Sequence, residues 1–278
     1  MLVNLKSIID IAYQEGYALG AYNCYNLETF QGAIEAAEEE NVAVIVAFGA
    51  KYLANMSLET AHAIAQSLAA KVSVPVCLHL DHCSDLDTIF KAIAVGFGSV
   101  MYDGSALPFE ENLKNTKLVC RVAHASGVSV EAELGSLATG LESHEGSDED
   151  VEKYTDPQQA KQFVKETGVD CLAVSIGTVH GLYKGKPDIR IDILEEINKE
   201  VNIPLVLHGG SGTPESDLRA CISNGIAKIN VNTEISNHVV SKTKEILADT
   251  RPHYSELSIS QKESVKEVVK KYINIYKK

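Results

Sequence analysis

The chain has 278 residues, of which 45% are hydrophobic, so it is long enough to bury one large α/β core or two small ones. Its 25 basic and 38 acidic residues give a formal net charge of −13, which argues against a nucleic-acid surface or an anionic membrane as the partner. No apolar run approaches the roughly 18 residues of a transmembrane helix, and the six scattered cysteines contain no CxxC pair. We therefore expect a cytoplasmic protein with no disulfide framework, no membrane partner and no nucleic-acid partner.

Short β-branched runs alternate with longer amphipathic segments along the whole chain. Before the first run, Leu5, Ile9 and Ala12 recur at helical spacing, so the N-terminal segment is predicted to be a helix. The eight predicted strands cover residues 17–23, 42–48, 74–81, 98–103, 128–134, 170–176, 203–208 and 226–232. Between them lie segments with apolar residues three and four positions apart, the pattern of a helix with one buried stripe.

Eight alternating strand and helix units predict an α/β fold, the (β/α)8 TIM barrel, as one domain over residues 1–278. A doubly wound open sheet is the competing fold, but it usually has fewer strands and opens on a GxGxxG turn, which this chain lacks. One segment interrupts the pattern, because residues 135–154 are glycine-rich and acidic. Connections this long are usually functional lids or solvated loops, and the place of this one directly after a strand favours a mobile loop that covers a site.

Three histidines, His82, His180 and His208, each stand just past one of the apolar runs. The carboxyl ends of parallel barrel strands meet at one rim, where the active sites of such barrels lie. Three imidazole nitrogens arriving there could bind a divalent metal and leave one coordination position open, as in catalytic zinc sites. A single histidine at a strand end is more often a hydrogen-bonded core residue, but three at equivalent positions favour a metal site.

The other strand ends bring more polar groups to the same rim. These groups are Asn23, Asp81, Asp103, Glu133, Asn230, Asn232 and Thr233. Asp81 directly precedes His82, so its carboxylate would lie beside any ligand of the metal, within reach for general acid/base work. The alternative role for Asp81 is a helix cap, yet Ser84 suits the cap of a helix beginning near Asp85 better.

Two short loops rich in glycine or amide side chains follow the last two strands. HGGSG contains Gly209, Gly210 and Ser211, and NVNT contains Asn230, Val231, Asn232 and Thr233. Barrels commonly bind phosphate at this point through backbone N–H groups and helix N-termini. Each loop alone would be an ordinary turn, but two of them on adjacent strands favour phosphate binding.

The segments GAYNCYN, LHLDH, MYDGS, VEAELG, SIGTVHG, VLHGGSG and KINVNTE follow one another in this order. With them the chain resembles, along nearly its whole length, the class II metal-dependent aldolases that act on fructose and tagatose bisphosphates. The resemblance implies reversible cleavage of a ketose 1,6-bisphosphate, foremost fructose 1,6-bisphosphate, to dihydroxyacetone phosphate and an aldehyde. It also implies a homodimer or homotetramer with one catalytic Zn2+ ion and a position for a second divalent or a monovalent cation.

The resemblance assigns roles to the same residues that the strand ends single out. His82, His180 and His208 match the zinc ligands, Asp81 matches the acid/base at the C4 oxygen, and Asp103 with Glu133 matches an alternative or second metal position. Asn23, Gly181, Gly209, Ser211, Asn230, Asn232 and Thr233 match residues that hold the substrate, mainly its dihydroxyacetone phosphate half. Glu142 is the candidate for the glutamate on the mobile loop that manages the proton at C3, with Glu145 as the alternative.

Two positions depart from the relatives that cleave bisphosphates. Ala47 stands where they carry a serine that grips the distal phosphate, and Lys262 aligns with their C-terminal arginine. The aldehyde half could therefore be unphosphorylated or a uronate, and the configuration at C4, which separates fructose from tagatose substrates, stays open. Two further alternatives are a Schiff-base aldolase that uses Lys228 and a barrel that binds sugar phosphates without turnover.

Overall fold

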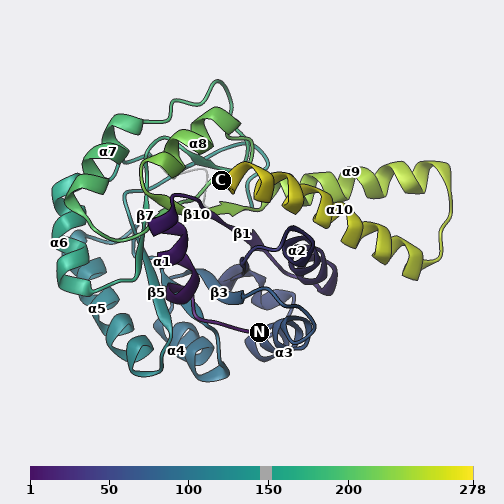
Figure 1. Ribbon diagram of the computed structural model, residues 1–278, viewed down its shortest axis with the longest axis horizontal. Coiled ribbons are helices and arrows are strands. Elements are labelled where there is room, and N and C mark those ends of the chain that lie inside the picture. The colour runs from purple at the N-terminus through teal and green to yellow at the C-terminus, as the bar shows by residue number, and fades with distance from the viewer. Residues whose placement is uncertain (145–151, 278) are drawn as a thin grey trace.

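The computed structural model describes residues 1–144 and 152–277, so Glu145, the alternative loop glutamate, lies outside the described residues. Within these residues, eight parallel strands close into a barrel that is surrounded by helices (Figure 1). The strands are β1 (Leu19–Asn23), β2 (Val44–Gly49), β3 (Val76–Cys83), β4 (Ser99–Tyr102), β5 (Ser129–Leu134), β7 (Cys171–Val174), β9 (Leu205–Leu207) and β10 (Ile226–Val231). Their order is β1-β10-β9-β7-β5-β4-β3-β2, and each neighbouring pair is parallel. The prediction of a (β/α)8 barrel is confirmed.

Helices connect the strands and begin at side-chain caps where the sequence offers one. The helices are α1 (Lys6–Glu15), α2 (Leu27–Glu40), the 3-10 helix η1 (Ala50–Ala54), α3 (Leu58–Ala69), α4 (Leu86–Val95), α5 (Phe109–Ala125), α6 (Pro157–Thr167), α7 (Ile191–Glu200), α8 (Glu215–Ser223), α9 (Thr233–Asp249) and α10 (Tyr254–Tyr276). The cap of α4 is Asp85, whose carboxylate accepts a hydrogen bond from the N–H of Thr88, so the prediction of Ser84 as the cap is wrong by one residue. Across the two described ranges, no helix has the length and apolar composition that crossing a bilayer requires.

The apolar core has two parts, because alternate side chains of each strand point to opposite faces. The larger part fills the space between the strands and the helices, and the smaller part lies inside the barrel. The predicted N-terminal helix is α1, and its Ile9 and Ala12, together with Leu5 directly before it, are fully buried in the smaller part with Ile45 and Val206. Figure 1 shows α1 lying across the barrel, so this helix closes the end opposite the carboxyl ends of the strands.

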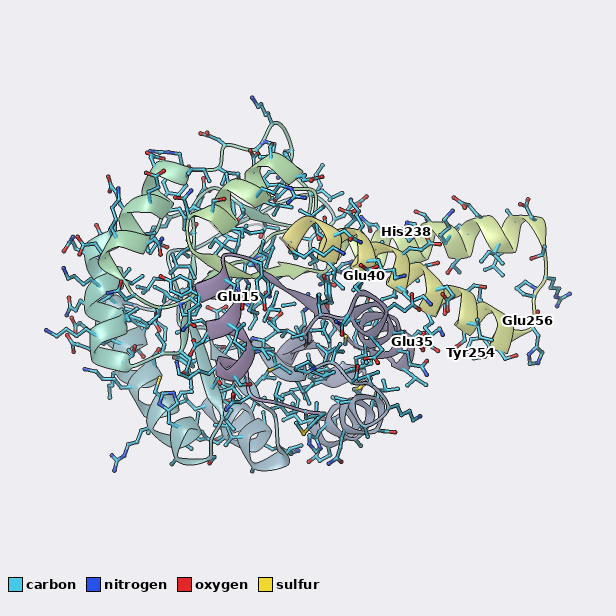
Figure 2. The ribbon with its side chains drawn as sticks, viewed as in Figure 1. Glu15, Glu35, Glu40, His238, Tyr254 and Glu256 are labelled. Atoms are coloured by element: carbon cyan, nitrogen blue, oxygen red, sulfur yellow. The ribbon has the colours of Figure 1, made fainter. Side chains whose placement is uncertain are left out.

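Helices α9 and α10 pack side by side and form an arm that extends away from the barrel (Figure 1). Figure 2 shows Tyr254 and Glu256 near the far end of the arm, and Glu35 and Glu40 of α2 near α10. Lys262 of α10 donates a hydrogen bond to Glu35 at 2.8 Å. Lys262, predicted to match the C-terminal arginine of bisphosphate-cleaving relatives, is therefore bonded to α2, outside the barrel.

The described part of the acidic segment 135–154 contains regular structure. The short strand β6 (Ala138–Thr139) pairs in parallel with β8 (Val179–His180), and Leu141 forms an isolated antiparallel bridge to Leu182. These pairings hold the first half of the segment against the strand that carries one of the three histidines. That the segment moves over the site stays a prediction.

Candidate functional site

The carboxyl ends of the barrel strands bring half of the predicted site residues into one pocket. The pocket is lined by Asn23, His180, Gly181, Gly209, Ser211, Asn230, Asn232 and Thr233. Gly210 joins two of the loops, because its N–H donates a hydrogen bond to the carbonyl of Asn230 at 2.9 Å. Val231 belongs to the predicted set, but its side chain is fully buried in the core between strands and helices and does not face the pocket.

The three predicted metal ligands meet at the same rim. Nε2 of His82 and Nδ1 of His208 are 2.7 Å apart, and the ring centroid of His180 lies 5.1 Å from that of His82 and 6.1 Å from that of His208. One nitrogen of each ring lies within 4.8 Å of the other two. Three imidazole nitrogens grouped this closely are a donor set that zinc and similar divalent ions accept, so the residues fit a metal ion.

His82 reaches the cluster because its strand is irregular. In a regular strand, neighbouring side chains point to opposite faces, so an inward Asp81 would turn His82 outward. The register of β3 against β4 shifts between Leu80 and Cys83, and His82 has a φ of 42°. Positive φ is costly for a residue with a Cβ and is often found at functional positions. This local strain allows two consecutive side chains to serve the same site.

Carboxylates hold the outer nitrogens of two of the rings. Nδ1 of His82 is 2.8 Å from Oδ2 of Asp103, and Nε2 of His208 is 2.9 Å from Oε1 of Glu131. A carboxylate accepts the hydrogen bond, so each outer nitrogen carries a proton, and the inner nitrogen of each ring is the one that would bind a metal ion at the shared centre. Carboxylate–histidine pairs of this kind orient the ligands in metal sites.

Asp103 and Glu133 also fit the second cation position that the sequence predicts. Together with His82 they offer three ligand atoms within 4.8 Å of one another. Glu133 is buried, and its burial together with the nearby carboxylate of Asp103 raises the pKa of Glu133 well above its ordinary value. Its Oε2 atom has no hydrogen-bond partner among the residues that the structure describes. A buried carboxylate oxygen that lacks a hydrogen-bond partner is a suitable ligand for a cation.

Asp81 lies between two asparagines that line the pocket. The side-chain amide of Asn23 donates to Oδ2 of Asp81 at 3.0 Å, and that of Asn230 donates to Oδ1 at 3.0 Å. Burial by itself would raise the pKa of Asp81, but the positive charges of His82 and Lys228 outweigh burial and hold this pKa well below its ordinary range. Asp81 is thus an oriented carboxylate beside the histidine cluster, as a general base requires.

Backbone geometry accounts for two of the predicted phosphate-binding glycines. Gly181 has a φ of 98° and Gly209 a φ of 73°, a region that residues with a Cβ rarely adopt. A Cβ on Gly209 would lie 2.3 Å from the carbonyl oxygen of Val179, and one on Gly181 would lie 2.5 Å from that of Leu141. The close approach of these loops therefore requires glycine, and a direct contact of either residue with phosphate stays a prediction.

Glu142, the candidate for the loop glutamate, is exposed and has a φ of 54°. Its carboxylate accepts a hydrogen bond from the side-chain amide of Asn237 on α9 at 2.5 Å. The structure therefore places Glu142 beside α9, with its carboxylate bonded to that helix and not to the histidine cluster.

Lys228 does not match the Schiff-base alternative. Fully buried inside the barrel, its ammonium group donates to both carboxylate oxygens of Glu131, at 3.0 and 2.7 Å. Burial favours the neutral amine, but the carboxylates of Glu131 and Asp81 outweigh burial and raise the pKa of Lys228 above its ordinary value. A Schiff-base lysine needs a lowered pKa, so the structure argues against this alternative.

Glu131 and Tyr52 belong to the site but are not among the predicted site residues. Glu131 and Glu133 are two residues apart in β5, so both side chains point to the same face of the strand, inside the barrel. This spacing is the signal in the sequence that indicates Glu131 as a site residue. Tyr52 lies in η1 after β2, and its hydroxyl accepts a hydrogen bond from the side-chain amide of Asn232 at 2.9 Å. No pattern in the segment around Tyr52 indicates this contact, which joins distant parts of the chain.

The register of β2 shows which of its residues lies at the level of the site. Ala47 is fully buried inside the barrel and pairs with Asn23 and His79 in the neighbouring strands. Gly49, two residues further on, pairs with Asp81 and so stands at the level of the site. Gly49, and not Ala47, is therefore the β2 position from which a side chain could reach the substrate.

Known proteins match this chain over most of its length. The family described as Fructose-bisphosphate aldolase class-II matches residues 3–278. A sulfofructosephosphate aldolase from Alkalicoccus urumqiensis is 44% identical over 249 residues, which are 90% of this chain and 86% of that protein. A fructose-bisphosphate aldolase from Staphylococcus aureus is 39% identical over 278 residues, covering 97% of this chain and 95% of that protein. The crystal structure of the YdjI aldolase from Escherichia coli K12 matches with a TM-score of 0.88 and 36% identity, covering 99% of this chain and 97% of that one.

Proposed function

The chain belongs to the class II fructose-bisphosphate aldolase family, and from this premise we propose that His82, His180 and His208 hold the catalytic metal ion of an aldolase. We propose zinc as the metal, because three imidazole nitrogens with an open position suit catalytic zinc. The observation that carries the proposal is the orientation of two rings. Their outer nitrogens are bonded to carboxylates, and their inner nitrogens lie 2.7 Å apart.

The reaction that these residues support is the cleavage of the bond between C3 and C4 of a ketose phosphate. A divalent ion bound by the histidines would act as a Lewis acid that stabilises the negative charge moving toward the C2 carbonyl. Asp81 takes the proton of the C4 hydroxyl group as the bond breaks, so that C4 becomes the aldehyde carbon. The amides of Asn23 and Asn230 hold both oxygens of Asp81 and orient the carboxylate before the substrate arrives.

Fructose 1,6-bisphosphate is the proposed substrate and dihydroxyacetone phosphate one product. Support for a phosphorylated ketose comes from the start of α9, where the backbone N–H groups of Asn232 and Glu234 converge on the hydroxyl of Ser211 at 3.3 and 3.2 Å. Convergent backbone donors at a helix N-terminus favour anions. Tagatose 1,6-bisphosphate, which differs only in its configuration at C4, is the nearest alternative substrate.

A ketose 1-phosphate with a different distal end is the second candidate. Gly49 offers no side chain at the end of β2, and Lys262 is bonded to Glu35 on α2, so two groups expected to hold a distal phosphate are engaged elsewhere or lacking. One of the relatives is a sulfofructosephosphate aldolase. An aldehyde half that is unphosphorylated, a uronate or a sulfonate therefore belongs in the same test.

Cleavage of fructose 1,6-bisphosphate, tagatose 1,6-bisphosphate and fructose 1-phosphate should be measured side by side, with EDTA and with zinc added back. We expect EDTA to abolish turnover and zinc to restore it, with fructose 1,6-bisphosphate cleaved fastest. Metal-dependent turnover that favours fructose 1-phosphate would support the second candidate. Turnover that EDTA leaves unchanged would overturn the metal mechanism, and binding of all three sugars without turnover would indicate a barrel that only binds.

Three further parts of the proposal have indirect support. The group of His82, Asp103 and Glu133 supports a second divalent or a monovalent cation. The six free, buried cysteines are usual for the cytosol, our proposed compartment. A homodimer or homotetramer stays a prediction that gel filtration with light scattering can check.

A further inference from the structure

A buried ion pair lies inside the barrel beside the histidine cluster. Nζ of Lys228 on β10 donates to Oε1 and Oε2 of Glu131 on β5, at 3.0 and 2.7 Å, and both side chains are 0% exposed. The interior layers of such barrels are usually filled by branched apolar side chains. A buried ion pair is often no more stabilising than well-packed apolar residues, because both charges lose their hydration. Stability alone therefore does not explain these two residues.

Glu131 connects the lysine to the histidine cluster. Its Oε1 atom is 2.9 Å from Nε2 of His208 and accepts a hydrogen bond from Lys228 as well. Its Oε2 atom accepts from Lys228 and lies 3.7 Å from the thiol sulfur of Cys171. With both oxygens bonded to the ammonium group, the carboxylate is held in one orientation and keeps the proton of His208 on Nε2. Nδ1 of that ring then faces His82 with its lone pair.

We propose that Lys228 and Glu131 act as one unit that positions His208 for metal binding. The inference rests on the proposed function, because the orientation of His208 matters only if this residue is a metal ligand. Lys228 is not among the residues that line the pocket and reaches the cluster through Glu131. Both are therefore positioning residues, and neither takes part in the chemical step.

The partner of the second oriented ring is held in a different way, which provides a matched comparison. Asp103, the partner of His82, stands at the rim with 24% of its side chain exposed, and its Oδ1 accepts from the hydroxyl group and the N–H of Ser105. Water can take the place of that hydroxyl group. Glu131 is fully buried inside the barrel, so bulk water cannot take the place of the lysine as it can take the place of the serine hydroxyl group. Loss of the lysine should disturb metal binding, and loss of the serine hydroxyl should not.

The test is the affinity for zinc, measured by competition with a chromophoric chelator in the absence of substrate. The variants are Lys228→Met, Glu131→Gln and the double variant. Loss of such outer partners typically weakens metal binding about 10- to 100-fold, and we expect a loss of this size in each single variant. Because Lys228 reaches His208 only through Glu131, the double variant should lose no more zinc affinity than the larger single loss. The double variant also removes both buried charges together, so it remains testable if a single variant fails to fold.

Three further variants separate the possible outcomes. Ser105→Ala and Cys171→Ala are the controls and should bind zinc as tightly as the parent protein. The absorption spectrum of the Co2+-loaded protein, a second readout, should change in the Glu131 and Lys228 variants and stay unchanged in the controls. If His208→Ala loses zinc while the double variant binds like the parent, or if the two single losses multiply, the positioning unit is refuted and the metal site stands. If His208→Ala itself binds zinc like the parent, the proposed metal site fails as well.

Discussion

The two ends of the barrel are built from the same eight strands but carry opposite kinds of side chain. At the end closed by α1, Leu5, Ile9 and Ala12 pack against aliphatic residues of the strands. At the other end, amides, hydroxyl groups and the imidazole of His180 line the pocket, and most of them are buried. Burial of apolar groups stabilises a fold, whereas burial of polar groups is costly unless each is hydrogen-bonded. One end therefore stabilises the barrel, and the other end uses part of that stability to hold reactive groups in place.

If the polar end holds the reactive groups, substitutions there should have the largest effect of all on the catalytic rate. Replacing Asp81 with alanine should lower kcat about 10²- to 10⁴-fold, because the substrate loses its general base. Bound zinc should stay at the parent level, since the three histidines keep their own contacts. Kinetics and metal analysis on one preparation test this pair of expectations. Asp81→Asn, which preserves the shape of the side chain, should lose turnover to a similar extent, and near-normal turnover in either variant would remove Asp81 from its role.

At the apolar end, a substitution should lower the stability of the fold and leave the catalytic rate unchanged. Ile9 is fully buried beneath the barrel, so Ile9→Ala should lower the free energy of unfolding by about 2–5 kcal/mol. Denaturant unfolding measures this loss, and kcat/KM of the folded variant should equal that of the parent. Ile11, which is 49% exposed on the same helix, supplies the control, because Ile11→Ala should leave both quantities unchanged. A large change in kcat/KM for Ile9→Ala would contradict the division between the two ends.

A smaller effect is expected at the edge of the polar end. Tyr52→Phe removes the hydroxyl group that accepts a hydrogen bond from Asn232, a contact of a type worth about 0.5–1.5 kcal/mol. We expect KM for the ketose phosphate to rise about two- to tenfold with little change in kcat. Tyr254→Phe, at the far end of the arm, is the control and should behave like the parent (Figure 2). Equal KM values for all three proteins would show that Tyr52 does not help to hold Asn232.

Substitutions of exposed charges outside the barrel should have the smallest effect on stability. Hydrogen bonds from Lys270 and Lys266 hold the pKa of Glu39, on α2, below its ordinary value of 4.5. A lowered pKa in the folded state stabilises the protein above the unfolded-state value, and this stability is lost as the pH falls through the folded-state value. Because the carboxylate is 44% exposed and screened by solvent, Glu39→Gln should cost less than about 1 kcal/mol near neutral pH. Urea unfolding from neutral pH to well below pH 4.5 should show the difference from the parent disappear, and a difference that persists in acid would have another cause.

The barrel and the place of its site could be predicted from local patterns. Strand and helix periods belong to short stretches of chain, so the eight strands were found within two residues of their observed ends. Parallel strands end at one rim, so His82, His180 and His208 could be placed together without knowing their distances. The cap of α4 was missed by one residue, because Ser84 and Asp85 are both good caps and the choice depends on where the first turn begins.

The contacts that orient the site could not be predicted in the same way. Glu131 and His208 are 77 residues apart in the chain, and Asn232 and Tyr52 are 180 residues apart. No local period specifies which side chains of different strands meet inside a closed barrel. The positive φ of His82 was equally hidden, because a regular strand was the expectation for LHLDH. The level of Ala47 relative to Gly49 became clear only from the register of β2 against β3.

The sequence alone determined the kind of fold, the family resemblance and the set of residues at the rim. Residue type and spacing along one strand are properties of the sequence, so these three conclusions need no tertiary structure. The tertiary structure decided which of those residues touch. It turned His82 inward, placed Glu131 and Lys228 behind His208, and engaged Lys262 on α2. The physical reason is that strand register and barrel closure set distances between distant segments, and hydrogen bonds depend on those distances to within tenths of an ångström.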